Sequence, residues 1–285
     1  MGVLKACWVM GAFLALFSLA GRADFILDAG NGRPVSQSDL SALLAKADFL
    51  LLGEIHDNPA HHQARGEWLA ALPARFRGLV LEQLDQGRSL DPRVPLDDAL
   101  DQAGFNRRGW DWPLHAPVIT AGRDRNMAIL GGNLPREAGR ALAKEGRAAL
   151  APELASMIDA APLDGTTRQR LEGDLAAGHC GKLPARHLPN MALAQRARDA
   201  SLARTLLAAG GPAVLIAGNG HVRRDYGVPT LLAGYRTLSV GFLEVTPGET
   251  PDAQAWRGIF DIVRFTPPAT RDDPCAGMVM PEGKR

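Results

Sequence analysis

Two short segments of this sequence place a glycine, an acid or amide, and a histidine at the end of an apolar stretch. Gly53-Glu54-Ile55-His56 ends the stretch 48–54, and Gly218-Asn219-Gly220-His221 ends the stretch 212–218. A carboxylate at the end of a buried strand is costly unless it has a partner. Carboxylates and imidazoles together can hold a divalent metal or act as general acid and base. We therefore predict that both segments belong to one polar site.

The apolar stretches predict the strands that position these groups. Short apolar runs ending in polar residues are typical of strands in a sheet covered on both faces. Such runs lie at 48–54, 78–83, 127–134, 212–218, 237–245 and 258–265. Between them, residues 135–210 are rich in Ala, Arg and Leu with helical spacing and predict a helical insertion. The pattern indicates an α/β fold with a mainly parallel or mixed central sheet covered by helices.

Ligands of such sheets bind beyond the carboxyl ends of the strands. If neighbouring strands share one edge, five polar side chains converge there: Glu54, His56, Glu82, Asn219 and His221. A hydrogen-bonded polar edge without a ligand is the alternative interpretation.

A helix is predicted to follow the first of these strands. Asn58 can cap it and Pro59 suits its first turn, so it runs to about Leu72 and carries His61 and His62. Adjacent helical residues point about 100° apart, so the two imidazoles cannot both face one ligand. We expect one of them to be exposed to solvent.

Two further segments carry residues that suit a large cofactor. Residues 109–117 contain Trp110, Trp112 and His115 together with two prolines, a composition that suits a flat apolar ligand with an iron-binding group, or the packing of a long loop. Residues 221–229 add two arginines that could pair with ligand carboxylates, and a tyrosine that could ligate haem iron. These are Arg223, Arg224 and Tyr226; a solvated turn is the simpler interpretation of either arginine alone.

The overall charge argues against nucleic acid as a partner. The chain of 285 residues has 32 basic and 31 acidic residues, a formal net charge of +1. A nucleic-acid-binding protein usually carries a basic excess. Its hydrophobic content of 46% allows a sizeable core.

The first 23 residues predict a cleaved signal peptide and a periplasmic location. Lys5 precedes an apolar run, and small residues allow cleavage after Ala20 or Ala23. The run is shorter than the ~20 residues of a membrane-spanning helix. The mature chain, 24–285, is predicted to form a single domain. It retains Cys180 and Cys275, which form a disulfide or remain two free thiols.

Taken together, the segments resemble the ChaN family, haem-binding proteins of iron uptake in the superfamily that contains the Tiki and TraB proteins. The resemblance covers residues 45–265 and rests on the order of several motifs. They are Leu52 to His56 with His61, His62 and Gln63; Leu81-Glu82; the Trp-rich segment; Asn133 to Arg136; Gln195 with Arg198-Asp199; Gly218 to Val222; and Gly227 to Pro229.

The resemblance implies an α/β fold with a helical part, a non-covalent b-type haem, and a homodimer that stacks haems at its interface. It also implies that the protein acts together with the haem-uptake machinery of the bacterial envelope. Where the family has Leu-Tyr-Ala-Pro, this chain has Leu114-His115-Ala116-Pro117. If the family tyrosine contacts iron, His115 takes its place.

Three hypotheses follow. The first is a periplasmic haem-binding protein in which His115 or Tyr226 ligates iron; the remaining cofactor-binding residues are Trp110, Trp112, His56, His221, Arg223 and Arg224. The second is a Tiki-like hydrolase of a peptide or ester, with a divalent metal or acid–base chemistry carried by Glu54, His56, Glu82 and His221. The spacing lacks a zinc-helix signature, so local sequence gives the enzyme no separate support. The third is a degenerate hydrolase fold that acts as a binding or scaffolding protein.

Overall fold

The computed structural model describes residues 25–273, 275 and 276. The predicted signal peptide lies outside these residues. Within them, no helix is long and apolar enough to cross a membrane.

A seven-stranded sheet forms the centre of the described chain, in the order β1-β7-β6-β2-β5-β3-β4. All neighbouring strands are parallel except β1, which pairs antiparallel with β7. The six strands predicted from the apolar runs correspond to β2 to β7, so the predicted α/β class is confirmed. The strands are β1 (Phe25–Asp28), β2 (Phe49–Leu52), β3 (Gly78–Asp85), β4 (Ala128–Asn133), β5 (Ala213–Ile216), β6 (Thr237–Glu244) and β7 (Ile262–Thr266).

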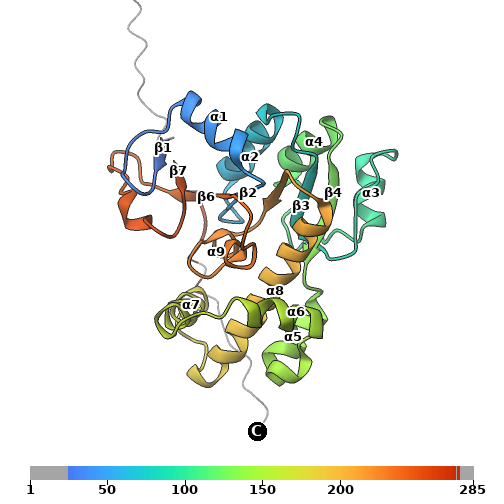
Figure 1. The fold of residues 1–285 in the computed structure, drawn as a ribbon, viewed down its shortest axis with the longest axis vertical. Coiled ribbons are helices and arrows are strands. Elements are labelled where there is room, and N and C mark those ends of the chain that lie inside the picture. Colours follow the sequence, from blue (N-terminus) through green and yellow to red (C-terminus); the bar gives the residue numbers. More distant parts are fainter. Residues whose placement is uncertain (1–24, 274, 277–285) are drawn as a thin grey trace, which may run out of the picture.

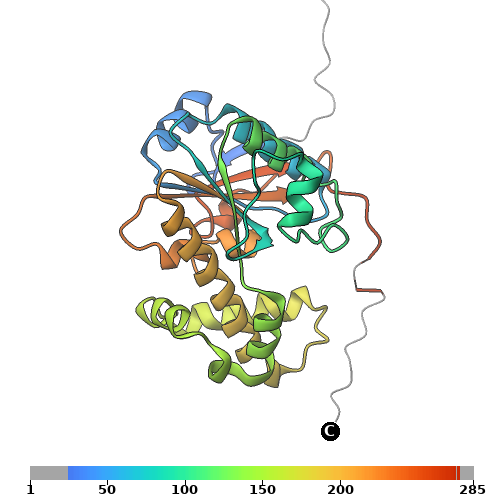
Figure 2. The ribbon, with the colours of Figure 1, turned by 90° about the vertical axis from the view of Figure 1, so that its right-hand side faces the viewer.

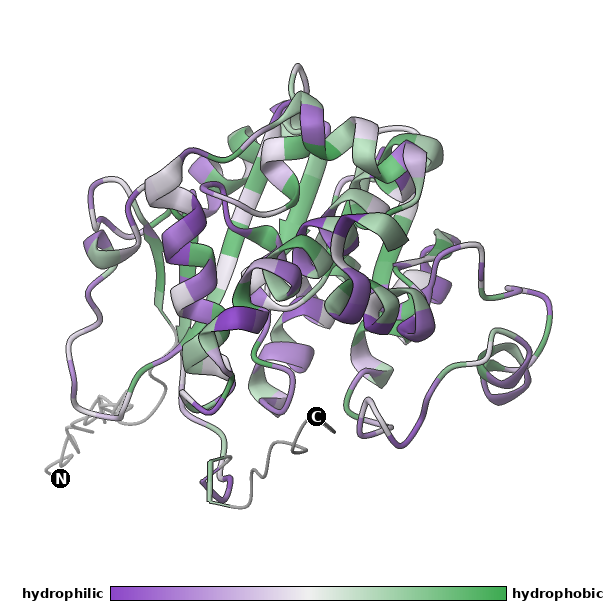
Figure 3. Ribbon diagram, turned by 90° about the horizontal axis from the view of Figure 1, so that it is seen from below, coloured by the Kyte–Doolittle hydropathy of each residue, from purple (hydrophilic) through white to green (hydrophobic). Residues whose placement is uncertain are grey.

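Helices cover both faces of the sheet (Figure 1), and alternation along the strands divides the core in two. Leu50 and Leu52 of β2 pack on one face with α1 (Gln37–Lys46), α2 (Pro59–Ala71), α3 (Leu96–Gln102) and α4 (Ala116–Asp124). Phe49 and Leu51 pack on the other face, against α8 (Leu188–Ala209). Seen from below, the strands are the most hydrophobic part of the ribbon (Figure 3). This burial on both faces explains why the strands are continuous apolar runs.

The predicted helical insertion forms a layer to one side of the sheet. It contains α5 (Arg136–Glu145), α6 (Pro152–Ala160) and α7 (Gly165–Gly178), and α8 runs from this layer back to the sheet (Figure 2). A single helix of 22 residues therefore belongs to both parts. Cys180, just after α7, forms a disulfide with Cys275 near the end of the described chain.

Helix α2 begins as predicted, but the expectation for its histidines was wrong. The Asn58 side chain accepts hydrogen bonds from the backbone N–H groups of Ala60 and His61. Both His61 and His62 are fully buried, so neither faces solvent. Helix α4 packs against α2 and covers the side that would otherwise be exposed.

Candidate functional site

Strands β2, β5 and β3 are adjacent, so their carboxyl ends bring the two glycine–histidine segments together. Leu52 of β2 pairs with Ile216 of β5, and Ile216 pairs with Leu81 of β3. The N–H of Asn219 then donates to the carbonyl of Glu54 at 2.9 Å. The predicted convergence of polar residues at one edge of the sheet is therefore present.

The centre of the first cluster is the buried carboxylate of Glu54. It forms an ion pair with Arg65 of α2, lies 2.5 Å from Nδ1 of His56, and accepts a hydrogen bond from Gln83 at 3.0 Å. Burial raises the pKa of Glu54, but the positive charge of Arg65 and the hydrogen bonds to His115 and His56 together outweigh it and hold that pKa well below its ordinary value. Glu54 is therefore an anion that orients His56.

Two further histidines contact this cluster from α2 and from the start of α4. Nδ1 of His62 accepts a hydrogen bond from Arg65 at 2.7 Å, and Nε2 of His115 lies 3.5 Å from Glu54. Their ring centroids are 4.3 Å apart. This approach depends on Gly66 of α2, where an added Cβ would lie 2.8 Å from the carbonyl oxygen of Pro117.

Arg65 already provides the cation of this cluster. Glu54, His62 and His115 offer ligand atoms within 4.8 Å of one another, a set that could hold a metal ion. The guanidinium of Arg65, however, contacts both Glu54 and the lone pair of His62 Nδ1. A metal would have to displace this buried arginine.

A second cluster joins His221 to two buried acids. His221 lies 2.6 Å from Asp199 of α8 through Nδ1 and 3.3 Å from Glu82 through Nε2. Glu82 also accepts the N–H of Gly218 at 2.7 Å. Burial lowers the pKa of His221, but the charge of Glu82 and the hydrogen bond to Asp199 more than reverse this and raise it to about 10. An imidazolium between two carboxylates is the expected state near neutral pH.

The raised pKa of His221 predicts a stability that falls in alkaline solution. The folded-state value, about 10, exceeds the ordinary value of 6.5. The stabilisation is therefore complete below about pH 6.5 and is lost as the pH rises toward 10. Urea denaturation between pH 6 and pH 10 should show this decline in the wild type and a shallower one in His221→Gln. Identical pH profiles for the two proteins would contradict it.

Asn219 ties the second segment to the neighbouring strand. Its side chain donates to the carbonyl of Phe242 at 2.6 Å and accepts the N–H of Phe242 at 3.0 Å. Only a glycine fits at position 53 beneath it, because a Cβ there would lie 2.1 Å from Asn219 Oδ1. Asn219 is thus a structural residue of the site.

Replacing Gly53 by alanine is expected to destabilise the protein by about 1–3 kcal/mol, the usual cost of overpacking a core. The added methyl group would push Asn219 away from Phe242. Gly173 of α7 is the matched control, because a Cβ there meets nothing within 4 Å. Gly173→Ala should be neutral or mildly stabilising. Equal urea midpoints for wild type and Gly53→Ala would refute the argument.

A cleft of about 390 Å³ opens beside the two clusters. Its lining includes Glu82, Trp110, Arg136 and Arg198. The His56 ring lies 5.1 Å from Trp110, and 46% of its side chain is exposed. Its Nε2 makes no hydrogen bond within the part of the chain that the structure describes. His56 is therefore the imidazole of this site that a ligand can reach.

The family model described as haem-binding uptake, Tiki superfamily, ChaN matches residues 40–232. The chain belongs to this family. A search of the curated proteins found no match.

One solved structure shares the fold of this ChaN family member. The ChaN of Campylobacter jejuni, solved with cofacially bound haem, has a TM-score of 0.65 at 18% identity, covering 85% of this chain and 96% of its own. A Bacillus cereus protein (TM-score 0.45, 13% identity, 85% and 95% covered) and an erythromycin esterase (TM-score 0.46, 13% identity, 84% and 95% covered) are more distant. Similarity at this level of identity describes the fold alone.

The structure places several predicted residues of this ChaN family member away from the cleft. The Tyr226 hydroxyl is buried among helices and donates to Asp174 at 2.9 Å. Burial raises its pKa far above the ordinary value. Arg223 pairs with Asp225 at 2.8 Å, and Arg224 with Asp261 at 2.9 Å. These two arginines already have carboxylate partners.

Two predicted aromatic positions have separate roles. Trp110 lines the cleft, whereas Trp112 packs edge-on against Phe105, with ring centroids 5.6 Å apart. His115 lies at the junction of loop and helix, where its Nδ1 donates to the carbonyl of Trp110 at 3.0 Å. His115 is buried beneath the cleft.

The residues not assigned to the site from the sequence are Arg65, Gln83, Asp199, Arg136 and Arg198. Arg65 could have been found by spacing, since it follows His62 by three residues and shares its side of the helix. Asp199 and Arg198 belonged to a recognised motif, but only the packing of α8 on the sheet shows that they reach the site.

Proposed function

We propose that this ChaN family member is an exported haem-binding protein of haem or iron acquisition, and that it binds haem in the cleft beside His56. The observation that carries the proposal is the half-exposed imidazole of His56, which is held by a buried carboxylate and whose Nε2 makes no hydrogen bond to a described residue. Imidazole nitrogen is a common axial ligand of haem iron. Bound haem would supply the iron centre, while the protein supplies the ligand and the shape of the cleft.

The chemistry of the cleft fits a porphyrin with carboxylate groups. Trp110 offers an aromatic surface on one wall. Arg136 and Arg198 form no ion pair with any described residue, and the Nε of Arg198 makes no hydrogen bond there. Unpaired guanidinium groups suit carboxylates, which they can bind through two parallel hydrogen bonds. We therefore assign the propionate contacts to Arg136 and Arg198 in place of Arg223 and Arg224.

His56 is the better candidate for the iron ligand than His115 or Tyr226. His115 is buried and its ring is hydrogen-bonded to Trp110. Tyr226 is bonded to Asp174 in the helical layer. Of these three residues, His56 alone combines exposure with a ring nitrogen that makes no hydrogen bond to a described residue.

A homodimer is part of the proposal. The cleft, at about 390 Å³, lies at the small end of the range of about 300–1,000 Å³ for ligand pockets. One copy of the protein would therefore cover part of a haem and leave the rest of the haem open to contact with a second copy. Cofacial haem binding by the Campylobacter jejuni ChaN supports this arrangement. The apolar N-terminal segment supports periplasmic export, where envelope haem-uptake proteins would be the partners.

Titration of the purified mature chain with haemin tests the proposal. We expect a saturable shift of the Soret band, and a change from monomer to dimer on gel filtration. Tyr226→Phe should leave the spectrum unchanged. Absence of a saturable spectral change would overturn the haem proposal, and saturation without dimerisation would overturn only the dimer.

A hydrolase of the Tiki type is the second candidate, favoured by the hydrogen bond of 2.5 Å between Glu54 and His56. A carboxylate that orients a reachable imidazole is the arrangement of a general base. Metal analysis and assays with nitrophenyl esters test it. Ester hydrolysis by the wild type that is lost in His56→Ala would favour the enzyme, whether or not the protein contains a stoichiometric divalent ion. Hydrolysis by the wild type no faster than in buffer alone would reject it.

A further inference from the structure

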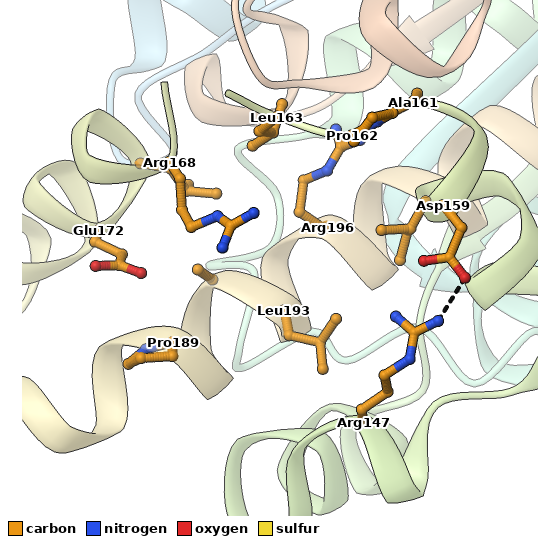
Figure 4. Close-up of a pocket in the computed structure, with 13 residues that line it drawn as sticks. Arg147, Asp159, Ala161, Pro162, Leu163, Arg168, Glu172, Pro189, Leu193 and Arg196 are labelled. Atoms are coloured by element: carbon orange, nitrogen blue, oxygen red, sulfur yellow. Dashed lines mark hydrogen bonds and ion pairs between the residues drawn. The ribbon is translucent and has the colours of Figure 1, made fainter. Parts of the chain in front are cut away.

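A further cavity lies in the helical layer, apart from the proposed haem cleft. It has a volume of about 470 Å³ and lies between α6, α7 and α8. Its apolar walls include Ile158 and Leu171. They also include Leu163 and Leu193, which are labelled in Figure 4. None of its lining residues lines the cleft beside His56.

A buried guanidinium group lies at the wall of this cavity. Arg196 of α8 is buried, and it donates to the carbonyl of Tyr226 at 2.6 Å, to the Thr230 hydroxyl at 2.8 Å and to the carbonyl of Ala161 at 2.9 Å. All three acceptors are neutral. Arginine has five N–H donors, so two remain for another partner.

No carboxylate within the described chain forms an ion pair with Arg196. The acid whose charge acts on it is Asp199, which is hydrogen-bonded to His221. A buried cation without an adjacent anion is costly, and buried charges are normally paired. The missing partner is consistent with an anion that binds from the cavity.

A second arginine reaches the same space. Arg168 extends from α7 toward the side of Leu193 and Arg196 (Figure 4), and its side chain forms no ion pair with any described residue. Arg147 also lines the cavity, but it is neutralised by Asp159 at 2.5 Å. Two cations without carboxylate partners thus line a partly apolar cavity, one in its wall and one at its surface; the carboxylate of Glu172 is also part of the lining.

From this combination we infer a second ligand site, which binds a fatty-acid-like molecule: a carboxylate held by Arg196 and Arg168, with its hydrocarbon chain among the leucines. The lining offers no histidine, tyrosine, cysteine or methionine as an iron ligand. The site is therefore unsuited to axial ligation of haem and is independent of the proposed haem cleft.

Fluorescence titration of the full mature chain with cis-parinaric acid tests the inference. We expect saturable binding, and at least about tenfold weaker binding of its methyl ester, because hydrogen bonds to a charged group contribute about 1.5–3 kcal/mol. Arg196→Gln should weaken binding of the acid by a similar factor. Leu193→Trp should reduce binding of the acid by filling the cavity.

Two surface variants keep the test informative if Arg196→Gln fails to fold. Arg168→Gln removes an exposed charge and should weaken acid binding several-fold without altering the haemin titration. Arg140→Gln, on the exposed side of α5 and outside the cavity, should change neither. Equal affinity for acid and ester, unchanged binding in Arg168→Gln, or no saturable binding would overturn the inference.

Discussion

Replacing Arg65 by methionine is expected to lower the free energy of unfolding by about 3–5 kcal/mol, the usual cost of removing one partner of a buried ion pair. Arg65 and Glu54 are both buried, and the guanidinium is the cation that holds the pKa of Glu54 low. Without it, the carboxylate would keep neutral or partly charged partners among the described residues, namely His56, His62, His115 and Gln83. Urea denaturation at neutral pH measures the loss.

A double-mutant cycle separates the ion pair from general damage to the core. Glu54→Gln should also be strongly destabilising, because it leaves Arg65 charged and buried. The double variant Arg65→Met, Glu54→Gln should lose less than the sum of the two, because neither charge then remains unpaired. Arg204→Met is the surface control, since Arg204 and Glu153 are both about half exposed and should contribute no more than about 1 kcal/mol. Additive losses in the cycle would refute the pairing argument.

Replacing His56 by alanine is expected to abolish the proposed Soret shift and to weaken haemin binding. Because His56 is the proposed ligand itself, the loss of affinity should exceed the roughly 10–100-fold that follows when only a hydrogen-bond partner of a metal ligand is removed. His187, an exposed histidine of the helical layer, is the matched control, and His187→Ala should bind haemin as the wild type does. A Soret shift that persists in His56→Ala and disappears in His115→Ala would reject His56 as the ligand.

The same ligand predicts the pH dependence of binding. Burial lowers the pKa of His56, but the hydrogen bond to Glu54 and the charge of Glu82 more than compensate, so its pKa lies above the ordinary value of 6.5. A proton on the imidazole competes with iron, so haemin affinity should fall as the pH decreases through that pKa. The fall should be absent in His56→Ala.

The backbone framework was predictable because it depends on patterns along the chain. Apolar runs at 48–54, 78–83 and 212–218 indicate strands buried on both faces, and the structure has β2, β3 and β5 there. Asn58 and Pro59 indicate the start of α2 for equally local reasons. Since parallel strands end at one edge, the meeting of Glu54, Glu82 and His221 followed from the same patterns.

Side-chain partnerships were not predictable, because they depend on which elements pack together. The spacing of His61 and His62 determines the angle between their side chains on α2. It does not show that α4 packs over them and buries both. Likewise, the sequence places Asp225 two residues after Arg223, but only the fold brings a second acid, Asp174, to 3.1 Å from it.

The two glycine–histidine segments show this division most clearly. The sequence by itself determined that each follows a buried strand and that a carboxylate and two imidazoles meet at one edge of the sheet. Only the tertiary structure decided their different roles: Arg65 and Glu54 hold His56 half exposed beside a cleft, whereas Asp199 and Glu82 enclose His221. The physical reason is that exposure and charge pairing are set by packing between elements distant in sequence, which no local pattern encodes.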